Sequence, residues 1–191
     1  LPLTPETLRE AFPAPTSKLC VLVHGLCCHE GAWDYPDNPA RSYGSALQDD
    51  LGYTPFFLRY NTGLPIPYNG TALDALLEKL LAAYPLDVEE LVLVGHSMGG
   101  LVLRGACHFG AERGATWVGK VKRVFYIGTP HEGAALERVG HLVNSVLHAV
   151  PHPITALLGD VAGKRSQGIK DLRHGTVLDG ELLVWPEGAE Q

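Results

Sequence analysis

A serine flanked by glycines is the residue in this sequence best placed to do covalent chemistry. The segment GHSMGG at residues 95–100 fits the pattern Gly-x-Ser-x-Gly, in which the serine sits on a sharp turn between a strand and a helix. Only glycine avoids steric clashes two residues before and two residues after the serine of such a turn. The pattern alone is too short to be specific. Here, however, an apolar run ends at Gly95 and a helical segment follows Ser97.

The turn predicts a particular backbone and environment for Ser97. We expect a strained backbone, with the hydroxyl exposed in a cleft above the carboxyl ends of the strands and at the positive end of a helix. Such a hydroxyl is a candidate nucleophile. An ordinary helical backbone or a buried hydroxyl would argue against this role. The alternative interpretation is a glycine-rich turn with an incidental helix-capping serine.

A second segment, HGL at residues 24–26, follows another apolar run and supplies a candidate oxyanion hole. A tetrahedral intermediate carries a negative oxygen, which catalysis stabilises with two backbone N–H donors. We expect these donors to be the amides of Leu26 and Met98, both without intramolecular partners. His24 is expected to be a buried, hydrogen-bonded histidine that shapes this loop rather than a proton shuttle.

Apolar runs and amphipathic segments alternate along the chain. Strands are expected at residues 19–24, 53–60, 90–95 and 122–127. Helices are expected at residues 41–51, 71–84 and 98–112, with an irregular entry segment and one helical turn in residues 1–18. Strands that alternate with helices predict a parallel sheet with right-handed crossovers.

The helix expected at residues 71–84 has the clearest amphipathic pattern. Its apolar stripe comprises Leu73, Leu76, Leu77, Leu80 and Leu81. Beyond residue 128 the pattern is weaker: a helix is expected at 135–149, a lid-like segment within 135–160 and a short strand at 182–185. We find no linker, so residues 1–191 are expected to form a single domain.

Charge and hydropathy exclude several classes of function. The 191 residues include 15 Lys and Arg against 21 Asp and Glu, a net charge of −6, which disfavours nucleic acid and anionic membranes as partners. The apolar window 91–110 has the length of a membrane span, but a His-Ser pair and a Gly pair lie at its centre. A buried strand, a turn and a helix explain it better, so we expect no transmembrane segment.

The cysteines favour a reducing compartment. Four cysteines are too few for a disulfide scaffold in a chain of this length, and no Cys-x-x-Cys spacing indicates zinc or redox chemistry. We therefore expect reduced thiols and a cytoplasmic location. Because the chain begins at Leu1 rather than Met, a removed secretion signal remains an alternative.

Three motifs in this order resemble those of α/β-hydrolase lipases and esterases. They are VLVHGL at 21–26, GHSMGGL at 95–101 and IGTPHEG at 127–133. They particularly resemble bacterial lipase-like proteins and the GPI inositol-deacylase-like group. The resemblance implies a small α/β-hydrolase-type parallel sheet flanked by helices, with Ser97 as nucleophile and the Leu26 and Met98 amides as oxyanion hole. It also implies that His131 and Thr129 shape the loop beside the site and are not members of a catalytic triad.

The family's triad is harder to complete from this sequence. In the family the acid and then the histidine follow the serine along the chain. That order favours Asp160 with His174 as a weak pair, because Asp171 is too near His174 in sequence. We therefore expect the chain to be a fragment that lacks the family's C-terminal strands, with apolar core surface exposed where they would pack. No histidine nitrogen is then expected within about 3.5 Å of Ser97 Oγ, and ester hydrolysis should be feeble.

These observations predict a serine carboxylic-ester hydrolase that forms an acyl-enzyme on Ser97, acts on a small-molecule or lipid ester and needs no cofactor. The alternatives are a non-catalytic or truncated module of the same fold, and an acyltransferase that uses the same serine. The spacing of His141, His148 and His152 could suggest a metal site on one helical face, but a proline interrupts the helix there and no carboxylate accompanies them. We therefore expect no metal.

Overall fold

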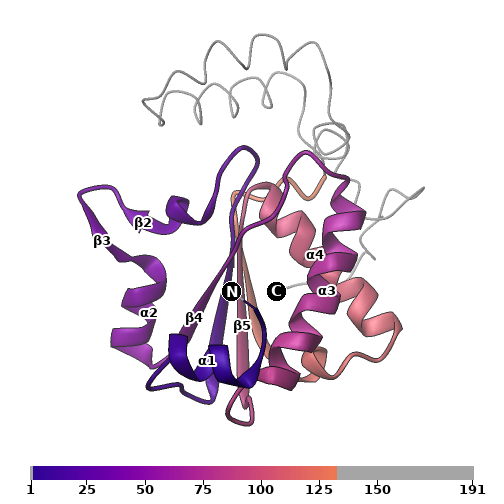
Figure 1. Cartoon of the computed structure of the whole chain (residues 1–191). Coiled ribbons are helices and arrows are strands. Elements are labelled where there is room, and N and C mark those ends of the chain that lie inside the picture. The colour runs from indigo at the N-terminus through magenta and orange to yellow at the C-terminus, as the bar shows by residue number, and fades with distance from the viewer. Residues whose placement is uncertain (1, 133–191) are drawn as a thin grey trace.

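A parallel β-sheet forms the centre of the structure, a computed structural model that describes residues 2–132 (Figure 1). Its strands are β1 (Lys18–Val23), β4 (Thr54–Leu58), β5 (Glu90–His96) and β6 (Val121–Ile127). They pair in the order β4-β1-β5-β6, and every pairing is parallel. The expected α/β architecture with a four-stranded parallel sheet is confirmed. Because β1 and β5 are neighbours, the two motifs that follow them meet at one edge of the sheet.

Helices cover the two faces of this sheet unequally (Figure 1). α3 (Ile66–Ala83) and α4 (Met98–Glu112) lie on one face, and α2 (Tyr43–Leu51) lies on the other. The strand residues that face α3 and α4 enter the larger core: Leu19, Val21, Val23, Leu91 and Leu93. The smaller core on the α2 face contains Cys20, Leu22, Trp33, Tyr53, Val92 and Val94. The apolar runs are therefore buried on both faces, as a parallel sheet requires.

The edge strand β6 carries exposed apolar side chains. Phe125, Tyr126 and Ile127 are 50%, 40% and 49% exposed. Phe125 pairs in register with Val94, which places it on the α2 face of the sheet. Within residues 2–132, β6 therefore presents apolar side chains on its surface.

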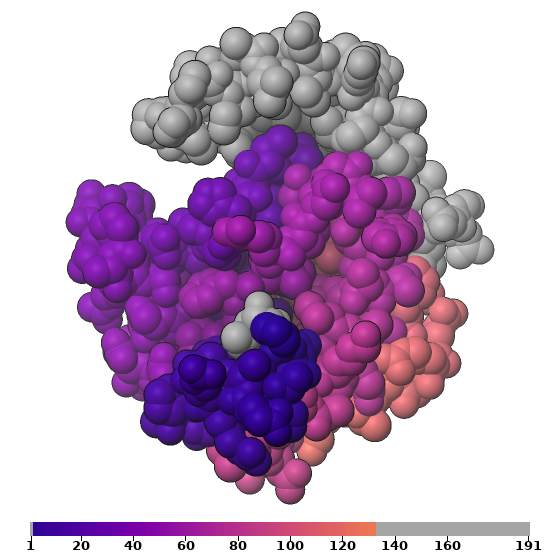
Figure 2. Space-filling model, viewed as in Figure 1, coloured from indigo at the N-terminus to yellow at the C-terminus, as the bar shows by residue number. Residues whose placement is uncertain are grey.

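The N-terminal segment is more regular than the sequence suggested. It forms α1 (Pro5–Ala11), which has seven residues rather than one turn. The Thr4 side chain accepts a hydrogen bond from the Thr7 N–H, and the Thr7 side chain accepts one from the Thr4 N–H, a reciprocal cap. Leu8 is fully buried. α1 lies in front of the β4 edge, where its side chains fill the lower part of the view beside α3 (Figure 2).

A small hairpin lies in residues 34–42, where the sequence predicted no strand. After the 3₁₀ turn η1 (Glu30–Trp33), strands β2 (Asp34–Tyr35) and β3 (Asn38–Ser42) pair antiparallel. Their residues are mostly polar and exposed, so no alternation of apolar and polar residues predicts these two strands. A second 3₁₀ turn, η2 (Thr116–Lys120), precedes β6.

The prediction of the apolar stripe on the helix at residues 71–84 is correct in part. α3 begins earlier, at Ile66, and buries Leu73, Leu77 and Leu80. Leu76, however, is 37% exposed, so its place in the buried stripe was wrong: it lies at the rim of a stripe centred on its neighbours. Among the helices described, none is long and apolar enough to cross a membrane, and the window 91–110 consists of β5, a turn and α4, as expected.

Two adjacent leucines of α3 provide a matched test of this packing. Leu77 is 1% exposed and Leu76 is 37% exposed. We expect Leu77→Ala to lower the free energy of unfolding by about 2–5 kcal/mol, because it leaves a cavity in the larger core. Leu76→Ala should cost less than about 1 kcal/mol. Urea unfolding followed by circular dichroism measures both. Equal losses would contradict the assigned face of α3.

Candidate active site

Ser97 lies at the junction of β5 and α4 and has a strained backbone. Its φ is 53° and its ψ is −125°, a positive φ that is uncommon for any residue other than glycine. Its backbone N–H donates to the carbonyl oxygen of Ile127 over 2.8 Å, which ties the turn to the end of β6. The side chain makes no capping hydrogen bond. The expected strain is therefore present, and the alternative of an incidental capping serine is not supported.

The glycines of the turn are required by close backbone packing. A Cβ on Gly99 would overlap the carbonyl oxygens of Val23 and His24, at the end of β1. A Cβ on Gly95 would lie 2.6 Å from Gly100 Cα. These neighbours are backbone atoms, which cannot move aside as a flexible side chain can. The turn after β5 is thus pressed against the end of β1.

The same packing buries the Ser97 hydroxyl. Ser97 is 3% exposed, and its Oγ is buried without a hydrogen-bond partner among residues 2–132. Gly25 packs against the Ser97 side chain, since a Cβ on Gly25 would be 3.0 Å from Ser97 Cβ. The expectation of an exposed hydroxyl is therefore wrong, because the chain that leaves β1 covers it. This burial is the one feature of the turn that argues against an open nucleophile.

The two candidate oxyanion donors flank this turn. Leu26 lies in a tight turn closed by a hydrogen bond from the Cys28 N–H to the Gly25 carbonyl oxygen at 3.3 Å. Cys27 has a φ of 58°, and a positive φ is what the third residue of a type II turn requires. Met98 is the first residue of α4, whose opening N–H groups have no partner within the helix. In the described part of the chain, neither the Leu26 N–H nor the Met98 N–H makes a hydrogen bond.

His24 lies buried at the start of the loop that follows β1. It is fully buried, its Nδ1 lies 2.9 Å from the Gly25 carbonyl oxygen, and its ring stacks on Tyr60 at 4.6 Å between centroids. Burial lowers its pKa, which keeps the ring neutral at pH 7. These contacts suit the expected role of a histidine that shapes the loop.

His131 and Thr129 lie on the loop after β6. Arg104 Nη1 lies 2.9 Å from His131 Nδ1, and the Tyr126 ring meets the imidazole edge-on at 4.7 Å. Burial, and then the charge of Arg104, lowers the pKa of His131. The Thr129 side chain packs over Gly100, which has no room for a Cβ. The sequence did not predict the contact with Arg104, because nothing in their spacing links the two residues.

No base for Ser97 is found in residues 2–132. The described histidines make no hydrogen bond to its Oγ, as we expected of His24, His96 and His131. Asp160 and His174 lie outside the described residues, as do the lid-like segment 135–160 and its histidines. In the same part of the chain, no three His, Cys, Asp or Glu side chains gather as a metal ion would need.

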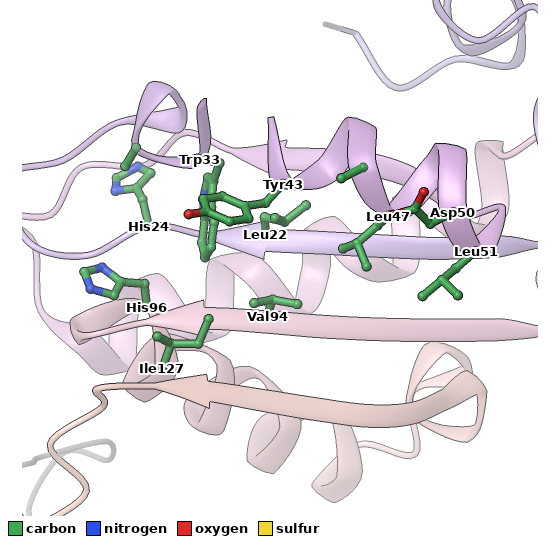
Figure 3. Close-up of a pocket in the computed structure, with 12 residues that line it drawn as sticks. Leu22, His24, Trp33, Tyr43, Leu47, Asp50, Leu51, Val94, His96 and Ile127 are labelled. Carbon is green, nitrogen blue, oxygen red and sulfur yellow. The ribbon is translucent and has the colours of Figure 1, made fainter. Parts of the chain in front are cut away.

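A cavity that the sequence did not reveal lies beside the turn, between the sheet and α2 (Figure 3). Its volume is about 560 Å³, a size typical of small-molecule sites. The residues that line it are Leu22, His24, Ala32, Trp33, Tyr43, Ala46, Leu47, Asp50, Leu51, Val94, His96 and Ile127. Its lining comes from five separate segments of the chain, which explains why no local pattern predicted it.

Comparison with known proteins identifies related sequences and folds. Residues 20–187 match the sequence model described as "Alpha/beta hydrolase family". The fold is similar to that of the mature lipase BlEst2 from Bacillus licheniformis, with 23% identity and a TM-score of 0.56, over 85% of this chain and 58% of the lipase. The chain therefore spans less than two thirds of that lipase. A lipase-esterase related protein from Clostridium acetobutylicum ATCC 824 matches at 12% identity with a TM-score of 0.45, over 84% of this chain and 67% of that one. No curated protein matches.

Two glycines allow a matched test of the packing around the turn. A Cβ on Gly99 would overlap backbone oxygens, whereas a Cβ on Gly119 would meet nothing within 4 Å. We expect Gly99→Ala to lower the free energy of unfolding by at least about 2 kcal/mol. Gly119→Ala should change it by less than about 1 kcal/mol. Thermal and urea unfolding measure both. A Gly99→Ala protein as stable as the parent would show that the turn and β1 are not in close contact.

Proposed function

The chain belongs to the alpha/beta hydrolase family, and on this basis we propose that it hydrolyses carboxylic esters with Ser97 as the nucleophile. Because one fold hosts many activities, the proposal must be argued from the site. The observation that carries it is the positive φ of Ser97 at the junction of β5 and α4. Backbone strain of this kind persists only where the surroundings impose it, and it is concentrated at functional sites.

The proposed reaction proceeds through a covalent acyl-enzyme. Ser97 Oγ attacks the ester carbonyl carbon while its proton passes to a base, and the carbonyl oxygen becomes an oxyanion. The N–H groups of Leu26 and Met98, which have no other partner in the described chain, would donate to that oxyanion. Collapse of the intermediate expels the alcohol, which takes up the proton. Water then attacks the acyl-enzyme in the same way and releases the acid.

The burial of the Ser97 side chain favours an uncharged substrate. The groups around Ser97 are the backbone of Gly25, the imidazole of His96 and the start of α4, and burial lowers the pKa of His96. A neutral ester can enter such surroundings without the cost of desolvating a charge. A small-molecule or lipid ester therefore fits better than a charged one, and entry requires the chain over Ser97 to move. An alcohol in place of water would make the same serine an acyltransferase.

A non-catalytic module of the same fold is the second candidate. The observation that favours it is the buried Ser97 Oγ, which has no hydrogen-bond partner in residues 2–132. A serine hydroxyl without a base is a poor nucleophile at neutral pH. The two candidates differ in whether Ser97 is activated, which can be measured without knowledge of the substrate.

A fluorophosphonate probe distinguishes the two candidates. We expect one probe molecule to attach to Ser97, as seen by intact mass and peptide mapping, and Ser97→Ala to abolish attachment. Ser17→Ala is the matched control, because Ser17 is half-buried and lies at the far end of the sheet, just before β1. Any ester turnover should also be lost in Ser97→Ala, a loss that reaches roughly 10⁶-fold in serine hydrolases. Failure of the folded parent chain to react would support the non-catalytic module.

The Leu26 amide can be removed with little change to its turn. Leu26 is the second residue of the turn closed by Cys28, and proline is favoured at that position of a type II turn. We expect Leu26→Pro, which lacks the N–H, to slow phosphonylation of Ser97 by about 10²–10³-fold relative to Leu26→Ala. Leu26→Ala removes the buried side chain but keeps the N–H. Equal rate constants for the two variants would exclude Leu26 as an oxyanion donor.

A further inference from the structure

The chain segments that leave β1 and β4 stay in contact beyond the ends of these strands. β1 and β4 are parallel neighbours in the sheet. Just after β4, the Tyr60 hydroxyl donates a hydrogen bond to the His24 carbonyl oxygen over 2.8 Å. Two residues later, Thr62 Oγ1 accepts a hydrogen bond from the Cys27 N–H over 3.3 Å. The segment after β4 is therefore attached both to the start of the loop that follows β1 and to its turn at residues 25–28.

Cys27 is the strained residue of this turn. Its φ of 58° is disfavoured for any residue that has a Cβ. The hydrogen bond that closes the turn, from the Cys28 N–H to the Gly25 carbonyl oxygen, does not use the Cys27 N–H. The bond from that N–H to Thr62 Oγ1 is thus a separate interaction, and it favours the positive φ. Because Leu26 precedes Cys27 in the same turn, the shape that Cys27 adopts is part of what presents the Leu26 N–H.

A buried amide on α3 holds Thr62 in place. Asn69 is 6% exposed, and its Nδ2 donates to the carbonyl oxygens of Asn61 and Leu64 over 3.1 Å and 3.4 Å. The Leu64 N–H donates to the Asn61 carbonyl oxygen over 3.3 Å, which closes a second turn around Thr62. Burial of a polar side chain is costly unless it is hydrogen-bonded, and Asn69 Nδ2 is used for this turn. α3, which packs on the larger core, therefore fixes where the Thr62 hydroxyl lies.

We propose that Thr62 is a positioning residue, which holds the turn at residues 25–28 in the shape that presents the Leu26 N–H to the oxyanion. Thr62 acts through the backbone of Cys27 and not by contact with the substrate. The inference rests on the proposed function, because a reaction at Ser97 is what needs that donor. No sequence pattern indicated this role, since Thr62 is 35 residues from Cys27 in the chain.

Three substitutions in the full chain test the Thr62 hydroxyl. Thr62→Val removes the acceptor and keeps the shape of the side chain, whereas Thr62→Ser keeps the hydroxyl. Thr71→Val is the matched control, because Thr71 is exposed on α3 and its hydroxyl donates to the Pro67 carbonyl oxygen of the same helix. By nuclear magnetic resonance, we expect Thr62→Val to speed hydrogen exchange of the Cys27 N–H about five- to tenfold, the effect of one lost hydrogen bond, and the other two variants to leave it unaltered. Unchanged exchange in a folded Thr62→Val protein would overturn the proposal, whether or not Ser97 reacts.

The rate constant for phosphonylation of Ser97 by the fluorophosphonate connects the turn to the reaction. We expect Thr62→Val to lower it about five- to tenfold, while Thr62→Ser and Thr71→Val react like the parent chain. Addition of Cys27→Gly to Thr62→Val should restore most of the rate, because glycine adopts a positive φ without strain. Faster Cys27 exchange with unchanged phosphonylation, or no recovery with Cys27→Gly, would overturn the proposal without affecting the role of Ser97. A folded parent chain that does not react would contradict the proposed function itself and, with it, the catalytic purpose of Thr62, whatever the exchange rates.

Discussion

The close contact between the start of α4 and the end of β1 is the constraint on which the candidate site depends. Gly99 touches the Val23 and His24 carbonyl groups, with no room for a side chain. For α4 to begin at this point, the backbone must change direction sharply at Ser97. This sharp turn accounts for the positive φ of Ser97. Such a conformation costs about 1–3 kcal/mol. The hydrogen bond from the Ser97 N–H to Ile127 and the packing of α4 hold it in place.

That contact also concentrates unpaired polar groups at one edge of the sheet. Within residues 2–132, the buried side-chain atoms without partners belong to His24, Trp33, Ser97 and Thr129. Three of these residues follow the ends of β1, β5 and β6. Elsewhere, buried polar groups are paired: Asp74 accepts from Arg113 Nε at 2.6 Å and from Trp117 Nε1 at 2.8 Å. Ligands of open α/β sheets bind at the carboxyl ends of the strands, so these unpaired groups lie where a ligand would be expected.

Sequence reasoning succeeded where one local pattern determines the structure. The apolar runs identified all four strands of the sheet, and the glycine spacing identified the strained turn at Ser97. It failed where the outcome depends on contacts between distant segments. The burial of the Ser97 hydroxyl under Gly25, the contact of His131 with Arg104 and the cavity beside α2 all depend on how segments stack. The polar hairpin was missed for a different reason, because its strands contribute almost nothing to the core.

The electrostatics at the carboxyl ends of the strands restrict which group could activate Ser97. A base that takes the serine proton must be stable as a cation, and a carboxylate partner provides that stability in a buried site. Burial lowers the pKa of His24, His96 and His131, and none of the three is hydrogen-bonded to a carboxylate of residues 2–132. Their folded-state pKa values lie below the ordinary value, so each resists the proton that it would have to accept. The proposed chemistry therefore requires a histidine that reaches the carboxyl edge of the sheet together with its own acid.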